Sequence, residues 1–311
     1  MTDITIGVDI SKEALDAYRF PSGESCRFDN TAKGHKALMR WIGSGVTRIV
    51  YEPTGAYHRG FERRLAKAGL PLVKVNPRQA RRFAEATGKL AKTDRCDAAM
   101  LARMGAVLAL TARPLGSALL NELKDLHLAR AALIKDRTAA SNRAKTLTLA
   151  LLRRHNNERL KQIQRQLGDI DQTILTLLKA DPDLAQRLDI LTSIPGVSDA
   201  TACALIIDMP ELGTLEPPQA ASLAGLAPVA RQSGTWTGRA FIRGGRANVR
   251  QALYMPALVA MRFNPDLKAK YQALKAAGKP AKVAITALMR KLIILANALL
   301  KAQRKWAPKT P

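Results

Sequence analysis

The stretch Ile4-Thr5-Ile6-Gly7-Val8-Asp9-Ile10 decides the fold of the first third of this chain. Its run of apolar, mostly β-branched residues is typical of a buried strand. Because side chains alternate along a strand, Thr5, Gly7 and Asp9 share the side opposite Ile6. A single acid at the end of such a run is usually a turn residue, so the meaning of Asp9 depends on the sequence around it.

Strands and helices alternate outward from this stretch. Residues 4–10, 14–20 and 25–28 predict three strands in a meander, and a helix over residues 33–42 follows, with Asn30 or Thr31 as its N-cap. We then expect a strand at 48–51, a helix near 57–68, a strand at 70–75 and a helix that begins at Pro77. This order predicts an α/β domain in which helices cover a sheet.

Three further acids stand out beside Asp9, one at the end of a strand and two on a helix. Glu52 follows the strand at 48–51, and Asp94 and Asp97 lie three positions apart, so they share one face of a helix. Taken singly, Glu52 suits a capped loop, and Asp94 and Asp97 suit the start of a helix. Together, four carboxylates would repel one another without a cation, and carboxylate oxygens are the ligands that Mg²⁺ or Mn²⁺ prefers. The four acids therefore predict a metal site for phosphodiester chemistry.

The charge of the chain favours a polyanionic partner. Its 50 Lys and Arg residues against 25 Asp and Glu residues give a net charge of +25. From Ala221 to the end there are 17 basic residues and a single acid, Asp266. Nucleic acid is the usual partner of such a field, and binding along a phosphate backbone should weaken steeply with salt. An acidic lipid or an acidic protein is the alternative partner.

Cysteine and histidine give no sign of a metal site. Cys26, Cys96 and Cys203 are scattered without zinc spacing, as expected for reduced thiols in a cytoplasmic protein. We identify no signal peptide, and the apolar run at residues 291–300 is too short to span a bilayer. These features predict a cytoplasmic protein with no membrane partner.

Long helices are predicted for residues 119–178. Apolar residues recur in steps of three and four from Leu160 to Leu177, which is the seam of a coiled coil. The polar stretch at residues 153–157 interrupts the pattern, and we expect a turn or a stutter there. The helices could pair within one chain or between chains, and their basic face could be a solvated scaffold or a nucleic-acid contact.

The last part of the chain is predicted to be mainly helical. Helices are expected at about 200–207, 248–261 and 282–300, and the segment 232–245 is expected to be a loop. Ile194-Pro195-Gly196-Val197 suits either an ordinary helix–helix turn or a turn whose backbone N–H groups face a phosphate. Trp236 could stack on a base or pack inside the protein. The arginines predicted to contact nucleic acid are Arg231, Arg239, Arg243, Arg246 and Arg250.

A family resemblance follows from the motifs. Gly7-Val8-Asp9-Ile10-Ser11-Lys12, Tyr51-Glu52-Pro53-Thr54-Gly55, Lys92-Thr93-Asp94…Asp97-Ala98 and Gln232-Ser233-Gly234 occur in this order. This set resembles the insertion-sequence one-ten family of bacterial transposases, called DEDD after its acids. The resemblance covers nearly the whole chain. It implies a RuvC-like, RNase H-like α/β domain at residues 1–112, a helical coiled coil at 113–180 and a mainly α transposase domain at 181–311.

The resemblance also implies a mechanism and partners. Ser233 would attack a DNA phosphate and form a phosphoserine link, with Mg²⁺ or Mn²⁺ held by Asp9, Glu52, Asp94 and Asp97. The partners implied are donor and target DNA, a structured guide RNA of the "bridge" type, and further copies of the chain as a dimer that pairs into a tetramer. From its chemistry alone Ser233 would be a turn residue.

Two other functions fit parts of the sequence. A metal-dependent RuvC-like nuclease would use the same acids on branched DNA, and Ser233 would then be structural. A non-catalytic nucleic-acid-binding protein would need neither the acids nor the serine. Replacing Ser233 separates the transposase from the nuclease, and replacing Asp9 separates both from the non-catalytic protein.

Overall fold

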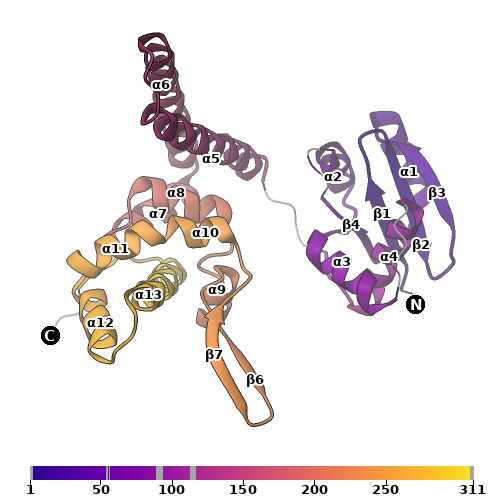
Figure 1. Cartoon of the computed structure of the whole chain (residues 1–311). Coiled ribbons are helices and arrows are strands. Elements are labelled where there is room, and N and C mark those ends of the chain that lie inside the picture. Colours follow the sequence, from indigo (N-terminus) through magenta and orange to yellow (C-terminus); the bar gives the residue numbers. More distant parts are fainter. Residues whose placement is uncertain (1–2, 54, 56, 89–93, 113–116, 309–311) are drawn as a thin grey trace. The chain divides into compact units, whose positions relative to one another are not determined.

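The computed structural model describes residues 3–53, 55, 57–88, 94–112 and 117–308, and for residues 94–96 it describes the backbone alone. The chain divides into two compact units, unit 1 (Met1–Leu115) and unit 2 (Gly116–Pro311) (Figure 1). Unit 1 is mixed α/β and unit 2 is mostly helical, which confirms the predicted classes of the two ends of the chain.

Unit 1 is built on a five-stranded sheet with the order β3-β2-β1-β4-β5. Its strands are β1 (Thr5–Ile10), β2 (Ala14–Phe20), β3 (Ser25–Asp29), β4 (Arg48–Tyr51) and β5 (Leu72–Lys74). The first three strands form the predicted antiparallel meander, while β4 runs parallel to both β1 and β5. The carboxyl ends of β1 and β4 therefore lie at the same edge of the sheet.

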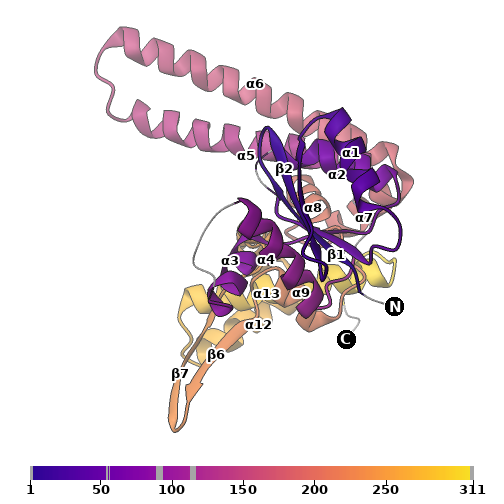
Figure 2. The same cartoon turned by 90° about the vertical axis from the view of Figure 1, so that its right-hand side faces the viewer.

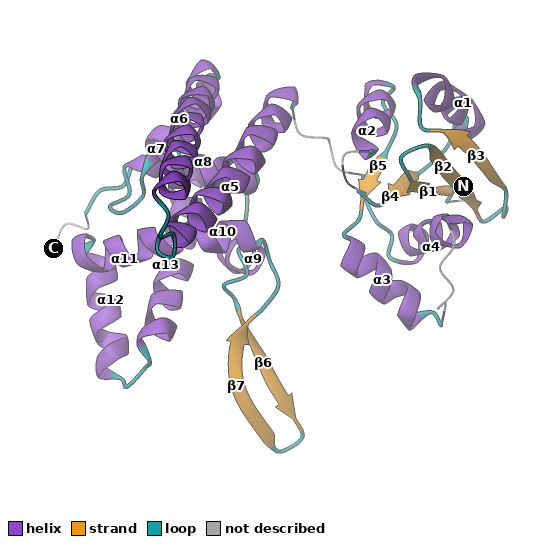
Figure 3. Ribbon diagram, turned by 45° about the horizontal axis from the view of Figure 1, so that its top comes forward, coloured by secondary structure: helices purple, strands orange, loops and turns teal. Residues whose placement is uncertain are grey.

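Two layers of helices cover this sheet, one on each face (Figure 3). The helices α1 (Ala32–Ile42) and α2 (His58–Lys67) pack on the face that carries Ile6, Val8 and Tyr51. On the opposite face, α3 (Pro77–Ala86) and α4 (Asp94–Val107) bury Val50 and Val73. Thr31 is the N-cap of α1, since its side chain accepts a hydrogen bond from the Gly34 N–H.

A pair of long helices opens unit 2 (Figure 2). The helices α5 (Ala118–Ala144) and α6 (Ala150–Ala180) pair within one chain, and the predicted seam residues Ile163, Leu167 and Ile174 are buried. Of the turn or stutter expected at residues 153–157, the turn was wrong, because that stretch is helical and the chain turns before Ala150. Its polar residues lie mostly on the solvated face of α6. Asn156 alone is buried, and its side chain donates to the Ala140 carbonyl at 3.1 Å.

The remainder of unit 2 is a helical core from which a hairpin projects. Its helices are α7 (Pro182–Thr192), α8 (Asp199–Asp208), α9 (Pro217–Leu223), α10 (Ala247–Ala252), α11 (Tyr254–Phe263), α12 (Pro265–Ala276) and α13 (Ala281–Lys301). The helix predicted at 248–261 is divided into α10 and α11. Between α7 and α8, Gly196 has a φ of 99° and packs on α11, because an added Cβ would lie 2.8 Å from the Pro256 carbonyl oxygen.

The loop predicted at residues 232–245 was also wrong. Strands β6 (Pro228–Ser233) and β7 (Trp236–Ile242) form an antiparallel hairpin that extends away from the helices (Figures 1 and 3). Nearly all of its residues are exposed. A ribbon without a buried face needs no alternation of apolar and polar residues, so its sequence resembles a loop.

Among the described residues, α13 is the one helix long and apolar enough to cross a membrane. It is longer than the apolar run at 291–300. Its residues Leu288, Leu292 and Ile293 are buried in the core of unit 2. This burial is expected of the central helix of a folded domain, so α13 gives no support for a membrane span.

Candidate active site

Asp9 and Glu52 occupy matching positions on neighbouring strands. In the parallel pairing of β1 with β4, Val8 is the partner of Tyr51. Asp9 is the next residue on β1, Glu52 is the first residue after β4, and both are partly buried. The two residues therefore belong to the same edge of the sheet.

Both acids belong to the face that packs on α4. A Cβ added at Gly7 would lie 2.0 Å from the carbonyl oxygen of Ala98, so β1 touches the backbone of α4 at that point. Since side chains alternate, Asp9 shares this face with Gly7. On β4, Val50 lies against Gly105 of α4, and Glu52 shares the face of Val50 by the same alternation.

The helix α4 runs antiparallel to β1, with its N-terminal end toward Asp9. Gly105, near the end of α4, contacts Thr5, whereas Ala98, near its beginning, contacts Gly7. Asp97 immediately precedes Ala98 and is partly buried. Asp94 is the first residue of α4, and its side chain lies outside the described residues. The helix therefore carries its two acids to the same edge as Asp9 and Glu52.

These acids fit a hard divalent cation by their chemistry and by their common edge. No group of three or more His, Cys, Asp or Glu side chains within metal-binding distance occurs in the part of the chain that the structure describes, which lacks the Asp94 side chain. The described side chains of Asp9, Glu52 and Asp97 therefore form no such group in this structure, and a metal site at this edge stays a prediction that also involves Asp94, one helical turn before Asp97.

Ser233 is the last residue of β6 and lies at the tip of the hairpin. It pairs with Trp236 across a two-residue turn, in which Gly234 has a φ of 56°. A tight hairpin turn needs such a left-handed residue, and glycine adopts it without strain. The Ser233 side chain is exposed, so its hydroxyl can reach a partner from outside unit 2.

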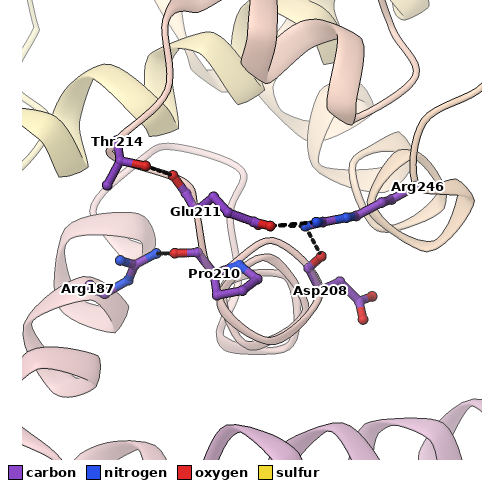
Figure 4. Close-up of polar contacts among 6 residues, drawn as sticks. All are labelled: Arg187, Asp208, Pro210, Glu211, Thr214 and Arg246. Atoms are coloured by element: carbon purple, nitrogen blue, oxygen red, sulfur yellow. Dashed lines mark hydrogen bonds and ion pairs between the residues drawn. The ribbon is translucent and has the colours of Figure 1, made fainter. Parts of the chain in front are cut away.

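The base of the hairpin is held on unit 2 by close backbone contact and by two arginines. A Cβ added at Gly245 would lie 2.1 Å from the backbone nitrogen of Gly225, so the two ends of the hairpin meet without a gap. Arg250 donates to the Gly244 carbonyl at 2.9 Å. Arg246 donates to both carboxylate oxygens of Glu211, at 2.7 and 2.6 Å, and to the Asp208 carbonyl at 2.7 Å (Figure 4).

The ion pair with Arg246 changes the pKa of Glu211. Hydrogen bonds from the Arg246 guanidinium lower the pKa of Glu211, against the opposing effect of burial. On the other side of the same loop, Arg187 donates to the Pro210 carbonyl at 3.0 Å (Figure 4). The loop after α8 is thus fixed from both sides and carries the hairpin base.

The five arginines predicted to contact nucleic acid fall into two groups. Arg231, Arg239 and Arg243 are exposed on or beside the hairpin, and Arg231 stacks over the Phe241 ring at 4.9 Å. Arg246 and Arg250 hold the hairpin base by the contacts described above, and their contact with nucleic acid stays a prediction. Trp236 is 58% exposed and packs over Gly238, so it can offer one ring face to a base.

Sequence reasoning missed the hairpin and the Glu211–Arg246 ion pair. The two glycines at Gly244 and Gly245 gave a partial signal, because such a pair allows the close backbone approach seen at the hairpin base. Glu211 and Arg246 are 35 residues apart, and no local pattern connects them.

Comparison with known proteins decides the family. Residues 6–154 match the family described as "Transposase", of the DEDD type of IS110, and residues 188–272 match "Transposase IS116/IS110/IS902 family". This chain belongs to the IS110 family of transposases. The first match covers the acids and the second covers Ser233.

Whole proteins similar to this transposase support the same activity. It is 28% identical over 328 residues to the "Pilin gene-inverting protein" of Moraxella lacunata and to that of Moraxella bovis, with 98% of each chain covered. It is 33% identical over 145 residues to an "Insertion element IS110" 43.6 kDa protein of Streptomyces coelicolor, across 46% of this chain and 35% of that protein. The chain is therefore a DNA transposase or recombinase, of a family that is typically metal-dependent.

Proposed function

We propose that this transposase cuts and rejoins DNA strands through a covalent link between Ser233 and a DNA phosphate. The observation that carries the proposal is the exposed serine at the tip of a hairpin whose base is held on unit 2 by Arg246 and Arg250. The acidic edge of unit 1 is the second half of the proposed site. The meander followed by two strand–helix pairs in unit 1 supports the RNase H-like, RuvC-like fold that the DEDD acids suggest.

Asp9, Glu52, Asp94 and Asp97 are proposed to hold the metal. Mg²⁺ or Mn²⁺ bound there supplies the positive charge that lowers the pKa of a hydroxyl and stabilises phosphate oxygens. The role of the chain is to keep the carboxylates at one edge, through the pairing of β1 with β4 and the contact of Gly7 with α4.

In the proposed step, the Oγ atom of Ser233 attacks the phosphorus atom of one DNA phosphate. A serine–phosphate ester forms and the bond to one deoxyribose oxygen breaks. The proton lost by Oγ is balanced by the proton gained by the leaving hydroxyl. Because one ester replaces another, bond energy is retained and the strand can be joined to a new end without ATP.

The site requires unit 1 and unit 2 to close over the same phosphate. We propose that this occurs in a dimer that pairs into a tetramer, in the bacterial cytoplasm, on donor and target DNA. Arg231, Arg239 and Arg243 are the exposed arginines closest in sequence to Ser233, and would contact the DNA backbone. A structured guide RNA would supply sequence choice by base pairing.

The covalent link is tested with three variants and a DNA substrate that carries the element ends. Ser233→Ala should abolish both the protein–DNA adduct, seen as a shifted band in denaturing gels, and the joined products. Asp9→Asn should abolish both products while DNA binding persists. The matched control is Thr235→Ala, which removes the other exposed hydroxyl of the same turn and should retain both.

Two results would count against the proposal. An adduct formed by Ser233→Ala would assign the nucleophile to another residue. Strand cleavage by Ser233→Ala without any adduct would instead identify a hydrolytic nuclease at the acids. The guide is tested separately, by sequencing the RNA that purifies with the protein: a discrete noncoding RNA is expected, and a heterogeneous mixture would contradict it.

A further inference from the structure

One side-chain amide connects the two loops that follow the acid-bearing strands of unit 1. Nδ2 of Asn30 donates to the Ser11 carbonyl at 2.8 Å and to the Tyr57 carbonyl at 3.2 Å. Ser11 lies two residues after Asp9 on the chain, and Tyr57 lies five residues after Glu52. Asn30 therefore joins the chain just after one acid to the chain just after the other.

Hydrogen-bond chemistry fixes the orientation of this amide. The two carbonyl oxygens can only accept, so the nitrogen of the Asn30 amide must face them. Its oxygen then faces Nε2 of His35, at 2.8 Å, and that nitrogen must donate. Nδ1 of His35 is left as an acceptor, and the Arg64 guanidinium, which can only donate, lies 3.2 Å from it. Each group in the chain of contacts has one consistent role.

His35 is held in place by burial. Only 1% of its surface is exposed, and its ring meets the Phe61 ring edge-on at 6.2 Å. Burial lowers the pKa of His35, and the Arg64 charge lowers it further, which favours the neutral ring that these contacts require. Asn30 is thus supported by a residue of the core between α1 and the sheet.

The main chain around Asn30 is equally constrained. Its N–H donates to the Glu13 carbonyl at 2.8 Å, which fixes the same β1–β2 turn a second time. Within that turn, the Ser11 hydroxyl donates to the Ala14 carbonyl at 2.9 Å. A Cβ added at Gly34 would lie 1.9 Å from the carbonyl oxygen of Asp29, the residue before Asn30. The start of α1 is therefore in close contact with the end of β3.

We propose that Asn30, oriented by His35, is a positioning residue that sets the spacing of Asp9 and Glu52 for metal binding. This rests on the proposed metal-binding function of the acids. Residues that support metal ligands without touching the metal typically change metal affinity or activity by about 10- to 100-fold when they are replaced. Asn30 holds the carbonyl groups of Ser11 and Tyr57, and the same order of effect is expected.

The test is Mn²⁺ binding by the full-length protein, measured by titration calorimetry, together with the metal dependence of strand cleavage. Asn30→Ala should weaken Mn²⁺ binding by about 10- to 100-fold and raise the metal concentration for half-maximal cleavage by a similar factor. Saturating metal should restore most of the cleavage rate. Asn30→Asp keeps the size of the side chain but loses both N–H donors, so it should weaken Mn²⁺ binding as Asn30→Ala does.

His35 and Thr31 provide the matched comparisons. His35→Gln retains a donor toward Asn30 and should bind Mn²⁺ better than His35→Phe, which retains only the ring volume. Thr31→Ala removes the N-cap of α1, next to Asn30 in sequence, and should lower the melting temperature without changing Mn²⁺ affinity. If Thr31→Ala and Asn30→Ala weaken Mn²⁺ binding equally, Asn30 is merely structural and the proposal is overturned.

The outcome is separable from that of the proposed function. If Asp9→Asn abolishes Mn²⁺ binding while Asn30→Ala leaves it unchanged, the acids hold the metal and the positioning role of Asn30 is disproved. If Asp9→Asn also leaves Mn²⁺ binding unchanged, the metal site itself is wrong, and the role of Asn30 is disproved with it.

Discussion

Gly7 is the residue that allows α4 to approach the strand that carries Asp9. A methyl group at this position would lie 2.0 Å from the Ala98 carbonyl oxygen and 2.5 Å from the Ala102 nitrogen, and backbone atoms cannot rotate away. Gly7→Ala should therefore push α4 outward, together with Asp97. We expect a loss of about 3 kcal/mol in the free energy of unfolding, measured by denaturant titration. The rate of metal-dependent cleavage should also fall.

Gly168 is the matched control for this substitution. It lies within α6, and an added Cβ would meet nothing within 4 Å. Gly168→Ala should stabilise the protein by roughly 0.5–1 kcal/mol, because alanine loses less backbone entropy in a helix. If Gly7→Ala proved as harmless as Gly168→Ala, the close contact of β1 with α4 would be wrong.

At the scale of elements, the β6–β7 hairpin depends on the Glu211–Arg246 ion pair. Because the folded-state pKa of Glu211 is lowered, the pair stabilises the fold above the ordinary glutamate pKa of 4.5, and this contribution is lost as the pH falls through the folded value. Glu211→Gln should therefore be less stable than the wild type at neutral pH, and the difference should shrink in acid. The check is the free energy of unfolding of both proteins over a descending pH series.

An exposed ion pair elsewhere in the protein provides the control for Glu211→Gln. Glu85 on α3 pairs with Arg81 at 3.3 Å, and both side chains are more than half exposed. Glu85→Gln should change stability by no more than about 0.5 kcal/mol at any pH. Glu211→Gln should also form less of the Ser233 adduct, since the hairpin base is loosened. An adduct yield equal to that of Glu85→Gln would show that the ion pair does not position the serine.

At the scale of the whole molecule, the two halves of the proposed site belong to different units of one chain. In the proposed symmetric oligomer, unit 1 of one protomer can serve unit 2 of its partner. Asp9→Asn and Ser233→Ala are each expected to be inactive. Mixed and reassembled, they should regain cleavage, because one protomer supplies intact acids and the other an intact serine. No recovery from verified mixed oligomers would assign the whole site to a single protomer.

The accuracy of the sequence predictions differed between local and distant features. The strand at Arg48–Tyr51 and the start of α3 at Pro77 were predicted to the residue, because burial pattern and proline geometry act locally. The turn before α6 was misplaced, since the polar run at 153–157 is mostly exposed to solvent within a helix and not in a turn. The hairpin was missed, since cross-strand backbone bonds hold it and no buried face marks it.

The sequence by itself indicated that unit 1 is an α/β domain and that Asp9 and Glu52 each lie at the end of a strand, whereas the pairing of those two strands came from the structure. Its motifs also indicated the family and, through the family, Ser233 as the proposed nucleophile. Only the tertiary structure decided that Gly7 lets α4 bring Asp97 to their edge, that Arg246 and Arg250 support the hairpin, and that Asn30 joins two loops. Periodicity records which side of an element is buried, whereas contacts between residues distant along the chain exist only after the elements have packed.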